Sequence, residues 1–534
     1  MIDLSNTIDA TFRELVKKRP ERTAIIFQDK EYSFAELNEM VEKIAAYLVG
    51  KGVKKQERAI IYLPHMPQWI GIWLALQRIG AVAVPVTHFY GDEELRYIGN
   101  DSGARIVFCA DRNLEKVLKA AEDTTFDKII VLGEEVKPEI KPMQNTAVKD
   151  MEIIPFSRIL SEDSPPLPEI LIESKDIAEI LYTGGTTGLP KGVPLTNVLL
   201  LEAAVITRMA SEPVIAKGEA VAVQGAPLNH IFGQEVGLGG LLYGDTLVLL
   251  PRMDLEILLS HIEKYKATIF FCTPTLCRMI LEYKDVDKYD LSSLAYVFTA
   301  GEALPVEVAR QWKERFNMPL YNGLGSTETC GGISLIPSGE SFPEGTSGKV
   351  VFTKTVLLLD PDTGEPVSPG EPGELYVSSE NMVTAYLNKP EETALHFVEM
   401  DGKMWYKTGD IVRIDKDGWL FFVDRSVDLI KHKGYRVAAT RVEGALYKHP
   451  AVSECCVVGV PDAKVGEKVK GFVVLKAGFE NVTAEELINW CSERLASYEV
   501  PAMVEFRETL PKTAVGKVLR RKIRDEERKK QETA

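Results

Sequence analysis

The stretch "YTGGTTGLPKG", residues 182–192, is the segment that decides the fold. Its glycines let backbone amides converge on an anion, its threonine hydroxyls add small donors, and Lys191 supplies positive charge. This composition predicts a loop that binds a polyphosphate. A P-loop needs Ser or Thr directly after the Gly-Lys pair, whereas Pro190 precedes Lys191 here and Gly192 follows it. A solvated glycine turn without a ligand is the other interpretation of the loop taken alone.

Short apolar runs rich in β-branched residues lie on both sides of this loop and alternate with segments of helical period. That alternation predicts parallel sheets covered by helices, and so two α/β subdomains. The runs before the loop are "RAIIYLP", "GAVAVPV", "ARIVFCA" and "DKIIVLG", and those after it are "GDTLVLLP", "ATIFFCTPT" and "LAYVFTAGEAL".

The texture changes after about residue 350, where "PDTGEPVSPGEPGELYV" is dense in turn-forming Pro and Gly between short strands. We expect a smaller β-rich subdomain there. The last hundred or so residues contain strands and helices of their own, enough for a separate α+β domain. The boundary is expected at Asp424–Asp428.

Length and charge limit the classes of function. A chain of 534 residues exceeds a single core, so at least two domains are expected. With 63 basic and 78 acidic residues the net charge is −15, which disfavours an extensive nucleic-acid surface. We expect no transmembrane segment, and without a signal-peptide pattern a cytoplasmic protein. The seven cysteines show no CxxC spacing and are predicted to be reduced and mostly buried, with no disulfide and no zinc site.

Six further strings follow in a fixed order: "PLNHIFG" (227–233), "TAGEAL" (299–304), "NGLGSTE" (322–328), "YKTGD" (406–410), "DRSVDLIKHKGYRV" (424–437) and "PKTAVGKVLRR" (511–521). Together with the glycine loop, this ordered set resembles the AMP-forming, adenylate-producing ligases, which include acyl-CoA synthetases, luciferases and peptide-synthetase adenylation domains. The resemblance implies an α/β fold. Two α/β subdomains and a β-barrel-like subdomain would form an N-terminal domain (1–424), joined by a hinge (425–428) to a small mobile α+β domain (429–534).

The resemblance also implies ATP, Mg²⁺ and coenzyme A. Phosphate contacts would come from Thr183, Gly185, Thr186, Thr187, Gly188 and Lys191. Glu328, with Thr183, would hold the metal, and Thr327 would bond the α-phosphate. Adenine and ribose would lie against Gly301, Glu302, Ala303, Asn322, Gly323, Leu324, Gly325 and Ser326, with Asp410 and Arg425 on the ribose hydroxyls. Lys517 would bridge the reacting carboxylate and α-phosphate.

The expected acyl site borders His230, the fifth catalytic candidate beside Lys517, Glu328, Thr327 and Lys191. Its other members are Phe232, Gly237, Ala300, Gly325 and Gly331. Gly237 and Gly240 fall on one helical face, and Gly331 and Gly332 would widen the same region, which favours a medium-chain, alicyclic or aromatic acid over acetate. Close helix packing explains these glycines equally well.

The coenzyme A residues implied by the resemblance are Lys431, Gly434 and Tyr435, which would reach the site after the C-terminal domain rotates. Three positions depart from the usual pattern. Gly184 stands where Ser is common, Leu324 where an aromatic ring often meets adenine, and Val427 where the hinge usually has Asp or Lys.

The leading hypothesis is an AMP-forming acid–CoA ligase, which could also run in reverse to make ATP. Its partners would be a carboxylic acid, ATP and coenzyme A, without nucleic acid, and the sequence is compatible with a homodimer. Two alternatives stay open: an adenylating enzyme that loads a carrier protein or acts as a luciferase-like oxygenase, and a catalytically silent nucleotide-binding protein.

Overall fold

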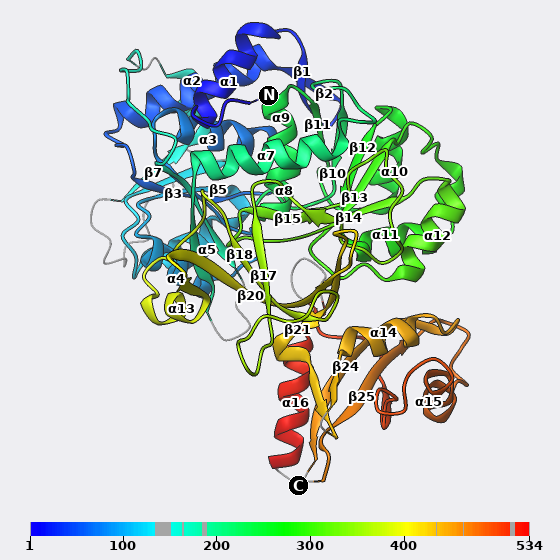
Figure 1. Cartoon of the computed structure of the whole chain (residues 1–534). Coiled ribbons are helices and arrows are strands. Elements are labelled where there is room, and N and C mark those ends of the chain that lie inside the picture. The colour runs from blue at the N-terminus through cyan, green and yellow to red at the C-terminus, as the bar shows by residue number, and fades with distance from the viewer. Residues whose placement is uncertain are drawn as a thin grey trace.

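The structure, a computed structural model, describes residues 2–133, 151–162, 165–183, 189–433, 435–462, 464–512 and 518–532. These residues form four β-sheets, three in a large N-terminal part and one in a small C-terminal part that lies below it in Figure 1. No helix in these ranges has the length and apolarity needed to cross a bilayer.

The first large sheet carries the start and end of the glycine loop. Its strands are parallel except for β9, which pairs antiparallel with β8. In spatial order they are β7 (Glu152–Pro155), β6 (Lys128–Leu132), β5 (Ile106–Ala110), β3 (Arg58–Tyr62), β4 (Val82–Pro85), β8 (Ile177–Thr183) and β9 (Lys191–Thr196).

The second large sheet carries the other predicted site residues. Its central strands run parallel, and β2, β15 and β16 are antiparallel to their neighbours. The order is β16 (Lys349–Val350), β15 (Gly331–Leu335), β14 (Leu320–Ser326), β13 (Tyr296–Thr299), β12 (Ile269–Cys272), β10 (Val221–Gln224), β11 (Thr246–Leu249), β1 (Thr23–Phe27) and β2 (Lys30–Ser33).

A layer of helices joins the two sheets into one core. A single cluster of buried apolar side chains contains residues of both sheets together with residues of these helices, so burial of apolar area on both helix faces holds the sheets together. The layer consists of α1 (Ile8–Lys18), α2 (Phe34–Gly50), α3 (Pro67–Arg78), α6 (Phe156–Ser161), α7 (Asn197–Ser211), α8 (Ile231–Gly233), the π-helical turn η2 (Gln234–Leu238) and α9 (Gly239–Tyr243).

The outer faces of the two sheets are covered by separate helices with their own apolar clusters. On the first sheet these are α4 (Asp92–Ser102) and α5 (Leu114–Ala121). On the second they are α10 (Leu255–Lys264), α11 (Pro274–Glu282) and α12 (Val306–Phe316). The α/β subdomains predicted from the alternating apolar runs are confirmed.

The third sheet is the predicted β-rich subdomain, curled into a half-barrel. It contains β17 (Thr355–Leu359), β18 (Gly373–Ser378), β20 (Lys403–Ile414), β19 (Phe397–Met400) and β21 (Leu420–Arg425), with α13 (Pro390–His396) before β19. All of its neighbouring strands are antiparallel, as expected for strands joined by Pro- and Gly-rich turns.

The C-terminal part has its own sheet and core. A short turn, η4 (Ser426–Asp428), follows β21 and leads into this part. Its sheet contains β22 (Ile430–His432), β23 (Tyr435–Val437), β24 (Val452–Asp462), β25 (Gly466–Leu475) and β26 (Met503–Phe506). Its helices are α14 (Ala439–Tyr447), α15 (Ala484–Ser492) and α16 (Arg520–Glu532). The small C-terminal α+β domain is confirmed as a fold, and the exact limits 1–424, 425–428 and 429–534 stay a prediction.

Candidate active site

The ends of the glycine loop are held by two neighbouring strands. Thr183 ends β8 and pairs in register with Lys191, the first residue of β9, so the loop connects an antiparallel hairpin. The Thr183 hydroxyl is buried and finds no hydrogen-bond partner among the described residues. The intervening Gly184, Gly185, Thr186, Thr187 and Gly188 lie outside the described residues.

Lys191 places a positive charge in a nearly buried position. It is 9% exposed, and its Nζ lies 4.4 Å from the centroid of the Tyr386 ring and 3.5 Å from Glu392 Oε2. A buried ammonium group is costly unless it is paired, and the ring and the carboxylate provide that compensation. The chain therefore keeps a cation at the start of β9, beside the glycine loop.

Glu328 connects to the same tyrosine from the second sheet. It follows β14, is 8% exposed, and its Oε1 accepts a hydrogen bond of 2.8 Å from the Tyr386 hydroxyl. Burial, with the nearby Glu328 charge, raises the pKa of Tyr386, so the phenol stays protonated and donates. Thr327, the preceding residue, is also buried. Tyr386 thus links the predicted metal ligand to Lys191.

An ion pair from the half-barrel joins this cluster. Asp410 on β20 faces Arg425 at the end of β21, and Arg425 Nε lies 2.6 Å from Asp410 Oδ1. Burial raises the pKa of Asp410, Arg425 opposes that rise, and the Glu328 charge adds to it. The same Asp410 charge raises the pKa of Arg425. Asp410 is 2% exposed, whereas half of the Arg425 side chain is exposed.

The predicted adenine and ribose residues lie where β13 and β14 end. Thr299 and Asn322 are register partners on these parallel strands, and Gly301 turns the chain away with φ of +86°. The carboxyl edge of such a sheet is a common place for a ligand. Buried polar atoms without a partner in the described part of the chain gather here: Thr299 Oγ1, Glu302 Oε1 and Asn322 Oδ1.

The other residues predicted to contact adenine and ribose differ in their packing and hydrogen bonds. Glu302 Oε2 accepts hydrogen bonds from the backbone N (3.2 Å) and hydroxyl (2.7 Å) of Thr275, at the start of α11. Close packing explains Gly325, because a Cβ there would lie 2.5 Å from Gly331 O. Gly323 is similarly enclosed, Leu324 is half-buried, Ser326 contacts Thr329, and Gly301 and Ala303 are exposed.

The predicted acyl residues lie around the turn that begins α8. His230 is the N-cap, and its Nδ1 accepts from Phe232 N at 3.2 Å. The Phe232 ring lies 5.8 Å from that of Phe298, two residues before Ala300 on the chain. His65, which the sequence did not single out, accepts from Leu228 N at 3.0 Å and fixes the same turn. Burial lowers the pKa of His65 to about 4, so the ring is neutral and can accept.

Two of the predicted space-making glycines border polar side chains. A Cβ on Gly237 would lie 2.5 Å from Gln224 Oε1, and one on Gly331 would lie 2.0 Å from Glu235 Oε2. Each glycine therefore makes room for a polar group where its own side chain would be. At these positions the close-packing alternative describes the contacts better than open space does.

The predicted coenzyme A residues lie on the β22–β23 hairpin. Lys431 Nζ is 3.8 Å from Asp362 Oδ1, and Arg436 contacts both Asp360 and Asp362, in the turn after β17. The Tyr435 ring stacks on Tyr498 at 4.2 Å. Gly434 and Lys517 lie outside the described residues. Val427 is exposed in η4, beside Asp428, which pairs with two arginines of α16.

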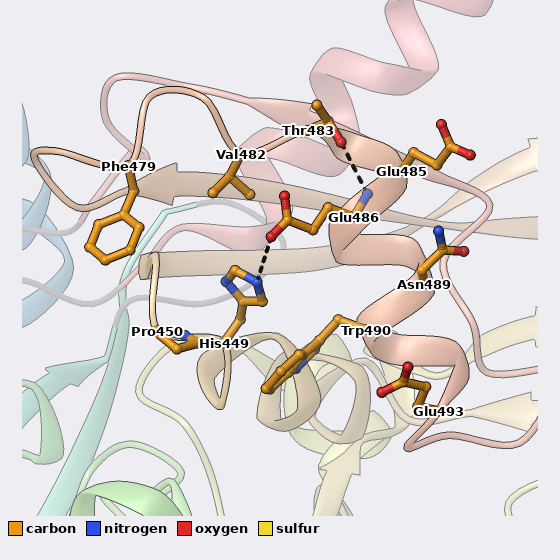
Figure 2. Close-up of a pocket in the computed structure, with 10 residues that line it drawn as sticks. All are labelled: His449, Pro450, Phe479, Val482, Thr483, Glu485, Glu486, Asn489, Trp490 and Glu493. Atoms are coloured by element: carbon orange, nitrogen blue, oxygen red, sulfur yellow. Dashed lines mark hydrogen bonds and ion pairs between the residues drawn. The ribbon is translucent and has the colours of Figure 1, made fainter.

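A hollow of about 660 Å³ lies on the C-terminal domain (Figure 2). His449 and Trp490 form part of its wall, and His449 Nε2 lies 3.5 Å from Glu486 Oε1. None of its lining residues belongs to a predicted site. The hollow therefore does not mark the catalytic region, which is identified by the ordered sequence motifs.

Comparison with known proteins identifies relatives along nearly the whole chain. The AMP-binding enzyme family matches residues 12–387, and the AMP-binding enzyme C-terminal domain matches residues 441–517. A long-chain-fatty-acid–CoA ligase of Bacillus subtilis (strain 168) is 33% identical over 539 aligned residues, covering 98% of this chain and 95% of its own.

Solved structures agree. The crystal structure of an anthranilate–CoA ligase in complex with anthranoyl-AMP superposes with a TM-score of 0.89, 27% identity and 99% coverage of both chains. An o-succinylbenzoate–CoA synthetase from Bacillus subtilis, in complex with ATP and magnesium, gives a TM-score of 0.80 at 27% identity, covering 96% of this chain and 98% of that one. The acids named for these relatives are a long-chain fatty acid, an aminobenzoate and a succinylbenzoate.

Proposed function

Because the chain belongs to the AMP-binding enzyme family and is an AMP-forming acid–CoA ligase that works through an acyl-adenylate, we propose that it activates a medium-chain, alicyclic or aromatic acid. ATP and coenzyme A are the co-substrates, and the reaction is reversible. Phe232 and Ala300 form the apolar side of the acyl site, and His230 borders the reacting carboxylate.

One observation carries the assignment of the site. Lys191, Tyr386 and Glu328 form a connected set of buried polar groups. Asp410, which pairs with Arg425, is close enough for the charge of Glu328 to raise its pKa. Buried oxygens without partners within the described ranges occur on Thr183, the register partner of Lys191, and on Asn322, near the end of β14. Native interiors satisfy most such groups, so these oxygens support a polar ligand.

These residues suit a magnesium nucleotide. A single carboxylate, Glu328, held by the Tyr386 hydroxyl, fits the preference of Mg²⁺ for hard oxygen ligands completed by water and phosphate. Thr183 offers an unpaired hydroxyl to the same end of the ligand. When bound, the ion supplies charge neutralisation where phosphate oxygens would otherwise repel an attacking carboxylate.

Different residues of the chain bind different charged groups of the substrates. Lys191 binds the outer phosphates together with Thr183, Gly185, Thr186, Thr187 and Gly188. Thr327 bonds the α-phosphate, and Lys517 orients the substrate carboxylate toward it. Since two anions must meet, preorganised cations and donors at this point lower the barrier directly.

At the nucleoside end, Asp410 accepts from the ribose hydroxyls while Arg425 keeps its carboxylate in place at 2.6 Å. Asn322 and Glu302 each have a buried oxygen without a partner in the described chain, and both lie beside the glycines expected to frame the base. Leu324 gives the base an aliphatic surface.

The second half-reaction requires a change of domain orientation about residues 425–428, between a domain of 1–424 and one of 429–534. The β22–β23 hairpin, with Lys431, Gly434 and Tyr435, then reaches the site, and Gly434 leaves room for the pantetheine arm. In the present structure Lys431 and Arg436 contact the turn at Asp360–Asp362, so these ion pairs must break first.

The test mixes the purified chain, Mg-ATP and a panel of acids, and measures AMP release with and without coenzyme A. We expect CoA-dependent AMP release with medium-chain, alicyclic or aromatic acids and little with acetate. Pyrophosphate exchange without any CoA turnover would instead support a carrier-loading enzyme. Incubating the acyl-CoA product with AMP and pyrophosphate, and measuring ATP, tests reversibility.

A further inference from the structure

A buried carboxyl group lies beside the residues proposed to contact the acyl tail. Glu235 belongs to η2, three residues after Phe232, and is 8% exposed. Its Oε2 accepts a hydrogen bond of 3.1 Å from Gly332 N, and a Cβ on Gly331 would lie only 2.0 Å from the same atom. The carboxyl group therefore occupies the place of a side chain at position 331.

Glu235 has no ion-pair partner of its own among the described residues. The nearby Lys354 is committed to Glu202, at 3.2 Å, with both side chains almost fully buried. No ion pair within the described ranges includes Glu235. Burial raises the pKa of Glu235 to about 8, although the Gly332 amide, Lys354 and Thr207 oppose that rise. Near neutral pH the group is thus largely an uncharged carboxyl, which both donates and accepts hydrogen bonds.

Another buried polar group faces the helical turn that carries Glu235. Gln224 is 1% exposed, and its Oε1 has no hydrogen-bond partner in the described part of the chain. Gln224 faces Gly237, where the absent side chain would lie 2.5 Å from Oε1. A neutral carboxyl group has one O–H donor and more acceptor sites than the one that the Gly332 amide uses, so Glu235 keeps hydrogen-bonding capacity.

We infer that Glu235 determines acyl specificity by selecting carboxylic acids whose tail carries a hydrogen-bond donor, a hydroxyl or an amino group. This inference rests on the proposed function, which places the acyl tail beside Phe232, three residues before Glu235. A purely hydrocarbon tail at this wall would leave the buried carboxyl group with the Gly332 amide as a partner and its remaining hydrogen-bonding capacity unused. Sites built to hydrogen-bond a substrate hydroxyl discriminate strongly against the analogue that lacks it.

The experiment compares acids of matched size with and without a donor. Hydroxy- and aminobenzoates are compared with the methylbenzoates at each ring position, and 6-hydroxyhexanoate with heptanoate, by kcat/KM for CoA-dependent AMP release. We expect the wild type to prefer the donor-bearing acid at least tenfold in one of these pairs. Glu235→Leu should reduce that preference at least tenfold, mainly by improving the acid without a donor. Glu235→Gln, which keeps hydrogen-bonding atoms in a similar shape, should retain most of it.

The control variant is Glu179→Gln. Glu179 is another buried carboxyl, 0% exposed, which accepts from Trp73 Nε1 at 2.9 Å. A structural effect there should change kcat/KM for all acids by a similar factor and leave the preference intact. If Glu235→Leu does not fold, the wild-type preference and the Glu235→Gln ratio still decide the matter.

The inference is overturned if the wild type turns over benzoates or alkanoates without preferring the donor in any pair, which would mean that ordered water alone satisfies Glu235. It is also overturned if Glu235→Leu keeps the wild-type preference. Absence of CoA-dependent AMP release with every acid would instead refute the proposed function, so the two failures are distinguishable.

Discussion

Replacing Tyr386 with phenylalanine tests the connection between the two halves of the site. Its hydroxyl donates to Glu328 Oε1 at 2.8 Å, and its ring lies 4.4 Å from Lys191 Nζ. Tyr386→Phe removes the donor and keeps the ring, so the stacking of Lys191 is preserved. The variant removes the hydrogen bond to the proposed metal ligand and, with the same hydroxyl, the hydrogen bond shared with Tyr406.

The size of the effect follows from the environment of that bond. A hydrogen bond to a charged, buried group contributes about 1.5–3 kcal/mol, and each 1.4 kcal/mol is a factor of ten. Loss of a group that orients a metal ligand costs about 10- to 100-fold in metal affinity or activity, which is the same range. We expect kcat/KM for adenylation to fall by about 10- to 100-fold, with a higher Mg²⁺ concentration needed for half-maximal rate.

The assay is pyrophosphate exchange as a function of free Mg²⁺ concentration, with saturating acid. Tyr62→Phe is the matched control, since the Tyr62 hydroxyl donates to a backbone carbonyl, that of Tyr90, and not to a site residue. It should leave the Mg²⁺ dependence unchanged. If Tyr386→Phe keeps kcat/KM and the Mg²⁺ requirement within twofold of wild type, the bond to Glu328 does not orient a metal ligand.

Three further outcomes are expected. Asp410→Asn should raise the KM for ATP about tenfold and lower the free energy of unfolding by about 1 kcal/mol. The loss of stability is smaller than for a fully buried pair because half of the Arg425 side chain is exposed. Initial rates measure the KM, and urea unfolding measures the stability. His65→Gln should reduce the loss of stability below pH 6.5. The lowered pKa of His65, about 4, means that the unfolded chain binds an extra proton between pH 6.5 and 4, so stability falls as the pH falls through that window. The free energy of unfolding at pH 7 and 5, with activity at pH 7, measures this effect. An unchanged dependence of stability on pH in the variant would contradict the prediction. Lys517→Ala should stop adenylation but spare thioester formation from preformed acyl-adenylate, and equal loss of both half-reactions in stopped-flow assays would count against its assignment.

The large sheets were predictable because their strands are buried on both faces. Runs such as "RAIIYLP" and "ATIFFCTPT" became β3 and β12, since a parallel strand covered by helices needs apolar residues at nearly every position. The order of strands within each sheet was not predictable. Neighbours such as β1 and β11 are far apart in the chain, and their pairing depends on contacts that local periodicity does not record.

The candidate site was predictable to the extent that its residues occur in motifs. Lys191 and Glu328 came from such strings, but Tyr386, which contacts both, did not. It lies 58 residues after Glu328, in "TAYLNKP", a segment that belongs to none of the quoted strings. Glu235 was missed for a related reason, because a glutamate beside a glycine-rich helix is usually solvated. Only the fold shows that β15 and α7 enclose it.

The hinge and the nucleotide site meet at two adjacent residues. Asp424 and Arg425 point to different partners, as neighbours at a strand end do. Arg425 contacts Asp410, the proposed ribose residue, at 2.6 Å. Asp424 is 0% exposed, accepts from Thr440 N at 3.1 Å and lies 3.6 Å from Arg520, both in the C-terminal domain.

Each neighbour therefore anchors one side of the predicted rotation. Burial raises the pKa of Asp424 to about 6, and the two C-terminal partners oppose that rise. A rotation that begins after Arg425 would separate Asp424 from Thr440 and Arg520 while leaving the Asp410–Arg425 pair intact. The free energy needed to expose or re-pair Asp424 then opposes the domain movement and does not affect nucleotide binding. Asp424→Asn should accordingly alter the thioester half-reaction more than pyrophosphate exchange.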